Sequence, residues 1–260
     1  MNIAIIGYGK MGKMIEQKAL ESGHKIAAIV DPVFSQSVSH TGTPVTKTIE
    51  ESHKLNNADA AIEFTTPDTV IPNIKALAQI KIPVIVGTTG WHEKLDQVKK
   101  IIEEAGTTLM WASNFSLGVS LFNHIAWYAA RLFNKFPEYD IGGFESHHNK
   151  KLDSPSGTAR ALVEGVLSRT ERKKKAVWET LNRSPAPDEL HYPSLRIGSV
   201  PGTHHLIFDS AADTIEIIHT ARNREALASG AVRAAEWIIR PGREKGVFAI
   251  DEMLKDMLEI

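Results

Sequence analysis

The sequence predicts an α/β protein with a Rossmann-type, doubly wound parallel sheet and a second, smaller α+β domain that contains an open mixed sheet. Two patterns support this fold class. Short apolar runs alternate with helical patterns from residue 2 to residue 111, and this rhythm stops at an amphipathic helix expected over 120–133. Such alternation is typical of a parallel sheet covered by helices. We place the first domain at 1–117 with 225–260 and the second at 118–224.

The first strand–helix connection carries a glycine-rich loop. An apolar run at 2–6 leads into Gly7-Tyr8-Gly9-Lys10-Met11-Gly12 and then a helical pattern, and a second apolar run at 26–30 ends at Asp31. This matches the dinucleotide-binding fingerprint, in which glycines permit a tight turn and close approach of the backbone to a pyrophosphate, while the acid accepts ribose hydroxyls. The first domain is therefore predicted to bind a dinucleotide.

Further strands of this sheet are expected at 60–64, 84–86 and 108–111, with helices between them. The last two strands end in Gly87-Thr88-Thr89-Gly90 and Ala112-Ser113-Asn114-Phe115. Strand ends line the ligand crevice of an open parallel sheet, so we expect the first of these loops beneath a nicotinamide ribose. Two alternatives stay open: a plain turn at 87–90, and Phe115 as a core residue instead of a neighbour of the nicotinamide ring.

A polar segment at 145–158 carries the second group of candidate residues. It contains His147, His148 and Lys151, and it follows a strand expected at 141–145. Proton donors and a fixed cation so close together are able to bind an anion and move a proton. The alternative is that these histidines are surface or packing residues.

The same segment ends at the start of a helix expected over 156–167, with Ser156 as its N-cap. The amides of Gly157 and Thr158 would point out of this helix start, where the peptide dipoles favour an anion such as a substrate carboxylate. Taken alone, the motif is also compatible with an ordinary helix start.

The rest of the second domain has alternating apolar runs. Strands at 195–197, 204–209 and 214–219 are expected to join residues 142–145 in one open sheet, with a face apolar enough to pair with a second subunit. No metal site is predicted. His204 and His205 would point to opposite faces of a strand, and no spacing completes a ligand signature with the histidines at 147–148.

Two further segments lie outside these motifs: a basic run and an alanine-rich helix. The basic run at 172–175 is interpreted as a solvated helix end. The helix expected at 226–239 is rich in alanine, which permits close packing, and we expect it to return to the first domain.

Composition limits the class of function. The 260 residues suffice for two cores, and a formal net charge of −1 provides no basic field for a nucleic-acid partner. The chain has no cysteine and no apolar run long enough for a signal peptide or a membrane span. We therefore expect a cytoplasmic protein that acts on a small molecule and binds neither nucleic acid nor membrane.

The polar segment also resembles a known family. Glu145-Ser146-His147-His148, Lys151, Asp153 and Pro155-Ser156-Gly157-Thr158-Ala159 are similar to the signature of 4-hydroxy-tetrahydrodipicolinate reductases, the dihydrodipicolinate reductases of bacterial lysine biosynthesis. The similarity continues through the glycine loop and through residues 64–65, 87–90, 114–116, 223–224 and 230–235. It covers nearly the whole chain.

The resemblance implies an NAD(P)H-dependent oxidoreductase that transfers a hydride to the unsaturated ring of a dicarboxylic imine, and a homotetramer built through the C-terminal sheets. It implies His147 as proton donor or acceptor and Lys151 as proton donor. The substrate carboxylates would be held by His148, Gly157 and Thr158. The implied cofactor contacts are Gly7, Tyr8, Gly9, Lys10, Met11, Gly12, Asp31, Gly87, Thr88, Thr89, Ala112, Ser113, Asn114 and Phe115.

Two departures from the family pattern concern the choice of cofactor. Many members have a glycine loop one residue longer with an arginine in it, and an arginine after the acid, whereas here Lys10 occupies a short loop and Pro32 follows Asp31. We therefore expect NADH to be preferred or used about equally, with NADPH still accepted. Two alternatives remain for the chain as a whole: another two-domain NAD(P)-dependent amino-acid or semialdehyde dehydrogenase, and a non-catalytic nucleotide-sensing protein.

Overall fold

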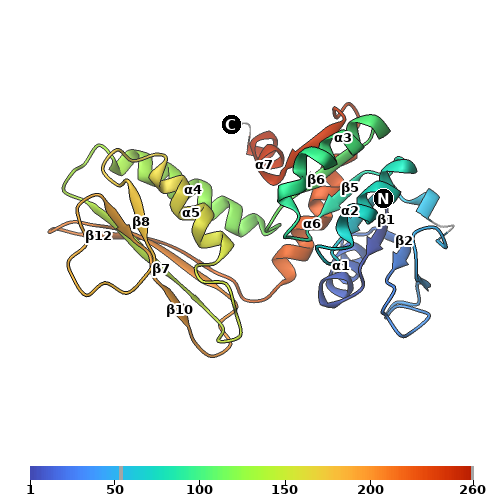
Figure 1. The fold of residues 1–260 in the computed structure, drawn as a ribbon, viewed down its shortest axis with the longest axis horizontal. Coiled ribbons are helices and arrows are strands. Elements are labelled where there is room, and N and C mark those ends of the chain that lie inside the picture. Colours follow the sequence, from blue (N-terminus) through green and yellow to red (C-terminus); the bar gives the residue numbers. More distant parts are fainter. Residues whose placement is uncertain (53–54, 259–260) are drawn as a thin grey trace. The chain divides into compact units, whose positions relative to one another are not determined.

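The computed structural model describes residues 1–52 and 55–258. The chain divides into two compact units, one made of Met1–Ser116 with Glu225–Ile260 and the other of Leu117–Arg224 (Figure 1). Each unit has a sheet and a hydrophobic core of its own. Over the described residues, no helix combines the length and the apolar character needed to cross a membrane.

The first unit is built on a seven-stranded, parallel sheet with the order β13-β6-β5-β4-β1-β2-β3. Its strands are β1 (Asn2–Ile6), β2 (Lys25–Val30), β3 (Val45–Thr46), β4 (Ala60–Glu63), β5 (Val84–Val86), β6 (Thr108–Trp111) and β13 (Gly246–Ala249). The chain moves outward from β1 to β3 and then from β4 to β13, so the topological switch point lies between β1 and β4. The predicted Rossmann-type sheet is confirmed.

The helices of this unit form two packed groups: α1 contacts α6, and α2 contacts α3. Their bounds are α1 (Lys10–Glu21), α2 (Val70–Gln79), α3 (Leu95–Ala105), α6 (Glu225–Ile238) and α7 (Ile250–Leu258), with short 3-10 turns η1 (Leu55–Asn57) and η2 (His92–Lys94). The close packing of α6 requires a small residue, because a Cβ on Gly230 would lie 1.7 Å from the carbonyl oxygen of Phe115. Through α6 the chain returns to this sheet, where β13, which the sequence did not predict, pairs with β6.

The second unit contains the predicted open mixed sheet, in the order β10-β7-β11-β12. Its strands are β7 (Asp140–His147), β10 (Ser194–Arg196), β11 (Thr203–Asp209) and β12 (Thr214–Thr220); β7 is parallel to β10 and antiparallel to β11. Helices α4 (Leu117–Phe133) and α5 (Gly157–Leu167) lie along one face (Figure 1), where Ile141, Leu206 and Phe208 are buried. The opposite face carries exposed apolar side chains, among them Leu195 and Ile218.

The basic run at 172–175 is not a solvated helix end, so that interpretation is wrong. Helix α5 ends at Leu167, and Lys173 is buried, with its Nζ donating to the carbonyl oxygen of Glu189 at 2.7 Å and lying 2.5 Å from Asp140 Oδ1. Beside it, β8 (Lys175–Val177) pairs with β9 (Glu189–His191) in a separate two-stranded sheet. The partners lie far from the run in the sequence, which is why its composition alone was misleading.

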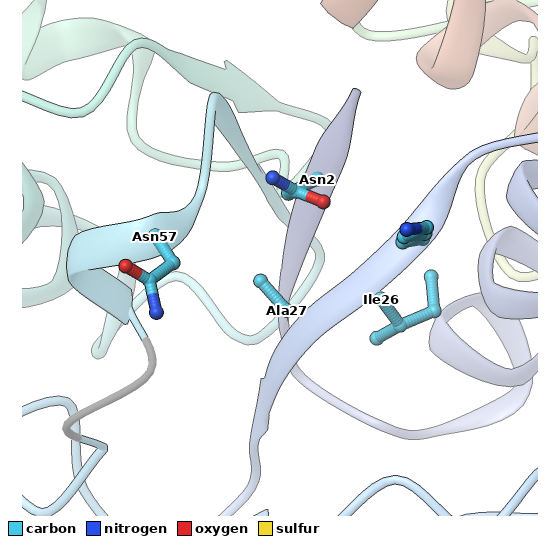
Figure 2. A pocket seen from close by; sticks show the side chains of 5 residues that line it. Asn2, Ile26, Ala27 and Asn57 are labelled. Carbon is cyan, nitrogen blue, oxygen red and sulfur yellow. The ribbon is translucent and has the colours of Figure 1, made fainter.

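A shallow hollow lies at the amino ends of β1 and β2, beside η1 (Figure 2). Its lining includes Asn2, Lys25 and Asn57. In a parallel sheet the carboxyl ends of the strands form the opposite edge, so this hollow is separate from the loops predicted to hold the cofactor. It contains none of the predicted site residues.

Candidate active site

The glycine loop turns directly after β1 and leads into α1. Gly7 has a φ of +92°, and a Cβ on it would lie 2.2 Å from the carbonyl oxygen of Phe64. A Cβ on Gly12 would lie 2.1 Å from the carbonyl oxygen of Gly7, whereas a Cβ on Gly9 would meet nothing within 4 Å. The fold itself therefore requires glycine at 7 and 12. The open space at Gly9, next to the start of α1, fits a pyrophosphate that approaches the backbone.

Asp31 follows β2 and is 7% exposed. Its Oδ2 accepts a hydrogen bond from the Tyr8 amide at 2.6 Å, and its Oδ1 accepts from the amides of Val33 and Phe34, both at 2.9 Å. The carboxylate thus joins the glycine loop to the loop after β2. These three donors occupy three of its four lone-pair sites, so Oδ2 keeps one for a further donor. The Tyr8 ring is buried with its hydroxyl donating to Glu16, so Tyr8 offers a ligand its backbone and not its side chain.

A buried acid joins two of the strand ends. Glu63, the last residue of β4, has no exposed surface and accepts hydrogen bonds from the hydroxyls of Thr65 and Thr88, the latter at 2.6 Å. The Thr65 amide in turn donates to the Thr88 hydroxyl at 2.7 Å. Burial raises the pKa of the Glu63 carboxyl, although both threonines donate to it. Thr88 was predicted to contact the cofactor, but its hydroxyl serves this internal network.

The loop at 112–115 is partly built into the core. Phe115 is 1% exposed, and its ring centroid lies 6.2 Å from that of Phe64. Of the two alternatives for this residue, the structure therefore supports packing in the core. Asn114 is half-buried, and its Oδ1 accepts from the Ser116 amide at 2.8 Å. The other predicted cofactor residues differ in exposure: Lys10, Thr89 and Ser113 are exposed, Met11 and Gly87 are half-buried, and Ala112 is buried.

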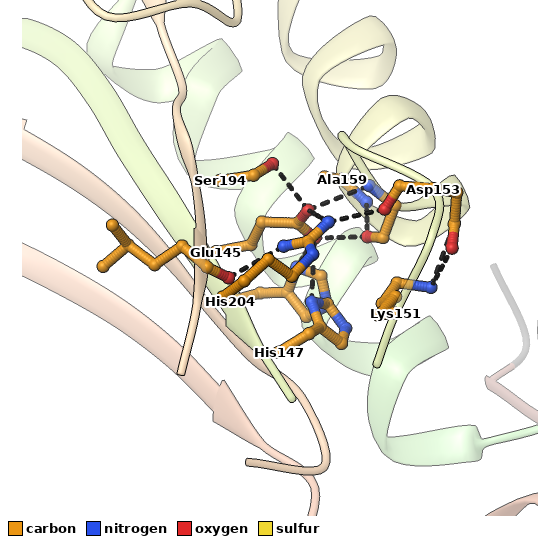
Figure 3. Close-up of polar contacts among 10 residues, drawn as sticks. Glu145, His147, Lys151, Asp153, Ala159, Ser194 and His204 are labelled. Atoms are coloured by element: carbon orange, nitrogen blue, oxygen red, sulfur yellow. Dashed lines mark hydrogen bonds and ion pairs between the residues drawn. The ribbon is translucent and has the colours of Figure 1, made fainter. Parts of the chain in front are cut away.

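In the second unit, the carboxylate of Glu145 is the centre of the polar segment (Figure 3). Glu145 lies on β7 without exposed surface, and its Oε1 accepts from the Ser156 amide at 2.9 Å and the Ser194 hydroxyl at 2.7 Å, while its Oε2 accepts from the Ser156 hydroxyl. The Arg196 guanidinium lies 3.5 Å from Oε1. Ser156 also caps α5 as predicted, accepting from the Ala159 amide at 3.1 Å.

Two histidines face the same carboxylate. Nδ1 of His147 lies 3.4 Å from Oε2 of Glu145, and Nδ1 of His204 lies 3.7 Å from it. The two rings meet edge to face, with centroids 5.3 Å apart. Both histidines are buried. His204 lies on β11, and the next residue of this strand, His205, points to the other face of the sheet, as the strand alternation predicted. The end of β7 and β11 thus bring together an acid and two imidazoles.

Lys151 lies in the turn that follows β7. Its Nζ donates to both carboxylate oxygens of Asp153, at 2.7 and 2.9 Å, and its side chain is partly buried. The carbonyl oxygen of His148 accepts from the Lys151 amide at 3.1 Å. At the helix start that closes the turn, Gly157 is exposed and Thr158 is half-buried. The five residues predicted to bind or act on the substrate therefore belong to one continuous segment that runs from the last residue of β7 to the first turn of α5.

Known protein families match both units. Residues 1–115 match the family model described as Dihydrodipicolinate reductase, N-terminus, and residues 118–254 match the model described as Dihydrodipicolinate reductase, C-terminus. The chain belongs to the dihydrodipicolinate reductase family. Between them the two models account for both units and for the polar segment at 145–158.

Individual relatives agree with this assignment. A 4-hydroxy-tetrahydrodipicolinate reductase of Christiangramia forsetii is 35% identical over 262 residues, with 100% of each chain covered. One of Staphylococcus aureus is 30% identical over 259 residues, 97% of this chain and 100% of its own.

Solved structures show a shared fold. A dipicolinate-bound dihydrodipicolinate reductase from Paenisporosarcina sp. TG-14 has a TM-score of 0.76 at 23% identity, with 96% of this chain and 97% of the other covered. An amine dehydrogenase from Mycobacterium smegmatis has a TM-score of 0.63 at 11% identity, with 96% of this chain and 95% of the other covered. Likeness at these identities extends to the fold alone.

The charges in this dihydrodipicolinate reductase site follow from burial and hydrogen bonding. Burial would raise the pKa of Glu145, but hydrogen bonds from Ser156 and Ser194 outweigh it, so the pKa lies below the ordinary carboxyl value. Burial lowers the pKa of both His147 and His204, although the charge of Glu145 opposes it. At neutral pH the cluster is therefore a carboxylate that faces two neutral imidazoles.

Over the part of the chain that the structure describes, Glu145, His147 and His204 are also spaced as metal ligands, with their ligand atoms within 4.8 Å of one another. Sequence spacing did not reveal this group, because β11 supplies one member. The surroundings disfavour a cation: Ser156 and Ser194 already donate to the carboxylate, and a guanidinium lies 3.5 Å from it. We assign no metal to this site.

Proposed function

We propose that this chain transfers a hydride from NADH or NADPH to the dihydrodipicolinate or 4-hydroxy-tetrahydrodipicolinate ring, giving tetrahydrodipicolinate in lysine (diaminopimelate) biosynthesis. The observation that carries the proposal is the match of both family models over 1–115 and 118–254, with a relative of this activity 35% identical over its full length. An NAD(P)H-dependent oxidoreductase is the enzyme class that follows.

The cofactor is assigned to the loops of the first unit. The amides at the start of α1 and the open backbone at Gly9 suit a pyrophosphate, and Oδ2 of Asp31 has a lone pair left for a ribose hydroxyl. A reduced nicotinamide, when bound there, supplies the hydride. The assignment comprises residues 7–12, Asp31, Gly87, Thr88, Thr89 and residues 112–115, with Tyr8 and Thr88 acting through their backbone and Phe115 as packing behind the loop.

The substrate is assigned to the segment between β7 and α5. A ring with two carboxylates needs cations and amide donors, which Lys151, Gly157 and Thr158 provide, with His148 beside them. Addition of a hydride to the conjugated imine leaves an electron-rich enamine, whose carbon then takes up a proton. Lys151 is the assigned donor of this proton, and His147, enclosed next to it, is the second proton-transfer group.

A spectrophotometric assay tests the proposed activity. Full-length protein with NADH or NADPH is mixed with 4-hydroxy-tetrahydrodipicolinate, and the absorbance of the reduced nicotinamide is followed. We expect a loss of absorbance that requires both protein and ring. Turnover with an amino acid or a semialdehyde in place of the ring would favour another dehydrogenase, and nucleotide binding without any turnover would favour a sensing protein.

The anion site predicts inhibition by pyridine-2,6-dicarboxylate, a planar ring that carries two carboxylates but accepts no hydride. We expect it to compete with the ring substrate, measured as an increase in KM at unchanged kcat. Thr158→Val should weaken the inhibitor by roughly 1–3 kcal/mol if the hydroxyl is a buried partner of the carboxylate. Thr214→Val, in an exposed hairpin position of the same unit, is the matched control. Absence of competition would count against the assignment.

The surroundings of Asp31 predict the cofactor preference. A 2′-phosphate next to this carboxylate would meet a like charge, a repulsion of about 1–4 kcal/mol at 4 Å depending on the effective dielectric. Pro32 provides no compensating charge. A cation lies near this loop, because Nζ of Lys47 donates to the carbonyl oxygen of Phe34. We therefore expect NADH to be preferred or used about equally in kcat/KM at fixed ionic strength. A preference for NADPH above about 10-fold, or 1.4 kcal/mol, would contradict this expectation.

Lys47→Gln should reduce kcat/KM for NADPH more than for NADH.

We further propose a homotetramer built through the open sheet face of the second unit, in the cytoplasm and without a nucleic-acid or membrane partner. The support is the apolar character of this face: Leu195 and Ile218 are 52% and 49% exposed, and Phe144 stacks on His205 at 4.2 Å. Sedimentation equilibrium should give four chains per particle, and Leu195→Glu should shift the mass downward. A monomer at micromolar concentration would refute the assembly.

A further inference from the structure

Glu145 carries a fully buried charge, and the reaction as assigned above does not use this residue. A buried carboxylate costs several kcal/mol unless partners compensate for it. Here Ser156 and Ser194 donate three hydrogen bonds, and the Arg196 guanidinium lies on the Oε1 side. These donors keep the group ionised. Among the described residues, Oε2 has as partners the Ser156 hydroxyl and the two imidazoles (Figure 3).

We propose that Glu145 is a positioning residue that holds His147 in the tautomer protonated at Nδ1, so that Nε2 carries the lone pair on the accessible edge of the ring. The inference rests on the proposed function only in that His147 is assigned to proton transfer there. It adds a residue that touches neither substrate nor cofactor and acts through another side chain.

The environment of Nδ1 favours a proton on this atom. This atom is enclosed and lies 3.4 Å from Oε2 of Glu145. An unprotonated Nδ1 would place a lone pair against the carboxylate and would have no donor among the described residues, and an unsatisfied buried group costs about 1–3 kcal/mol. A separation of 3.4 Å is long for a hydrogen bond, and such contacts often shorten when a substrate binds. A neutral imidazole holds one proton, so Nδ1–H makes Nε2 an acceptor.

The other edge of the His147 ring carries Nε2. His147 retains 7% exposure although its Nδ1 has none, so the exposed atoms lie on the side away from Glu145. Gly202 borders this edge: a Cβ there would lie 2.9 Å from Nε2, and the backbone has a φ of +152°. The Ile197 amide donates to the His147 carbonyl at 2.8 Å, which holds the base of the side chain. The ring is thus held in place, with Nε2 on the edge away from Glu145 and beside Gly202.

His204 is the second imidazole that faces the same carboxylate. Burial lowers its pKa, so at neutral pH it brings no positive charge to Oε2, and its Nδ1 is the more distant at 3.7 Å. Its ring meets the His147 ring in an edge-to-face contact. The charge of Glu145 is therefore directed mainly at His147. The titratable and charged groups around this pair are Lys151, Asp153, Arg196, His204 and His219.

Nitrogen NMR of the full-length protein with ring-labelled histidine tests the tautomer without substrate or turnover. The His147 signals are assigned by their loss in His147→Gln. At neutral pH we expect a protonated Nδ1 and an unprotonated Nε2 in the wild type. We expect this preference to be lost in Glu145→Gln, whose amide would donate to Nδ1. A wild-type His147 protonated at Nε2 would overturn the proposal even if Glu145→Gln did not fold.

Kinetics then test the consequence for proton transfer. Because the charge of Glu145 raises the pKa of His147, its removal should lower that pKa and move the acid limb of kcat/KM to lower pH. We expect Glu145→Gln to lower kcat by about 10-fold or more, with the KM for NADH unchanged. A wild type that oxidises no reduced nicotinamide would refute the proposed function and leave the NMR result intact.

Glu189→Gln is the matched control. Glu189 is a second buried carboxylate of the same unit, 4% exposed and bound by Arg183 at 2.7 Å, and it has no contact with His147 in the described structure. We expect this variant to lose stability but to keep the tautomer and the acid limb. If both variants lowered kcat only in proportion to their folded fraction, Glu145 would be a structural residue and the proposal would be wrong.

Discussion

Lys151→Ala is expected to lower kcat by about 10²- to 10⁴-fold without changing the fold, because a positioned proton donor contributes this much to a rate. The ammonium of Lys151 contacts only Asp153 among the described residues, so its removal breaks no buried network. KM should also rise, since the same cation is assigned to a substrate carboxylate. Steady-state kinetics with a circular-dichroism melt of each variant provide the measurement.

Lys150→Ala is the matched control for charge, because Lys150 is the exposed neighbour in the same turn and has no assigned role. It should retain kcat to within about 2-fold, as surface substitutions commonly do. His147→Ala should also lower kcat strongly. Losses below about 10-fold for both Lys151→Ala and His147→Ala would contradict the assignment of proton transfer to this segment.

Gly12→Ala is expected to destabilise the first unit by about 1–3 kcal/mol and to abolish tight NADH binding, because overpacking against a fixed neighbour forces the structure to shift. The added Cβ would lie 2.1 Å from the carbonyl oxygen of Gly7, and that neighbour is backbone. Relief of the clash must move the glycine loop away from the start of α1. Urea unfolding without cofactor, together with NADH titration, separates the two effects.

Gly9→Ala is the variant that distinguishes folding from binding. Its Cβ meets nothing within 4 Å, and the φ of −74° at Gly9 suits alanine. Stability should therefore change by no more than about 0.5 kcal/mol. NADH binding should weaken by about 10-fold or more, because the methyl group occupies the space assigned to the pyrophosphate. Unchanged NADH affinity in Gly9→Ala would show that the open space at Gly9 has no role in binding.

The features that could be read from the sequence depend on residues close together in the chain. The glycine loop, the parallel sheet and the Ser156 cap each rest on local backbone geometry or on a hydrophobic period within one element. The elements that were missed are short or lack such a period. Strand β13 has four residues, and β8 begins inside a run of charged residues.

The site itself shows the same division. His147 and Lys151 were singled out from one stretch of sequence because they lie four positions apart beside a helix start. The surroundings that set their chemistry come from other strands: Ser194 and Arg196 from β10 and His204 from β11. Sequence reasoning considered His204 only as a metal ligand and did not single out the other two.

By itself, the sequence determined which segment contains the candidate proton-transfer groups, where the dinucleotide fingerprint lies and which fold class contains both. The tertiary structure decided that Glu145 is ionised, that His147 is neutral and which edge of its ring is accessible. The reason is physical: capping and periodicity act within a few residues, whereas burial and charge depend on every strand that surrounds a side chain.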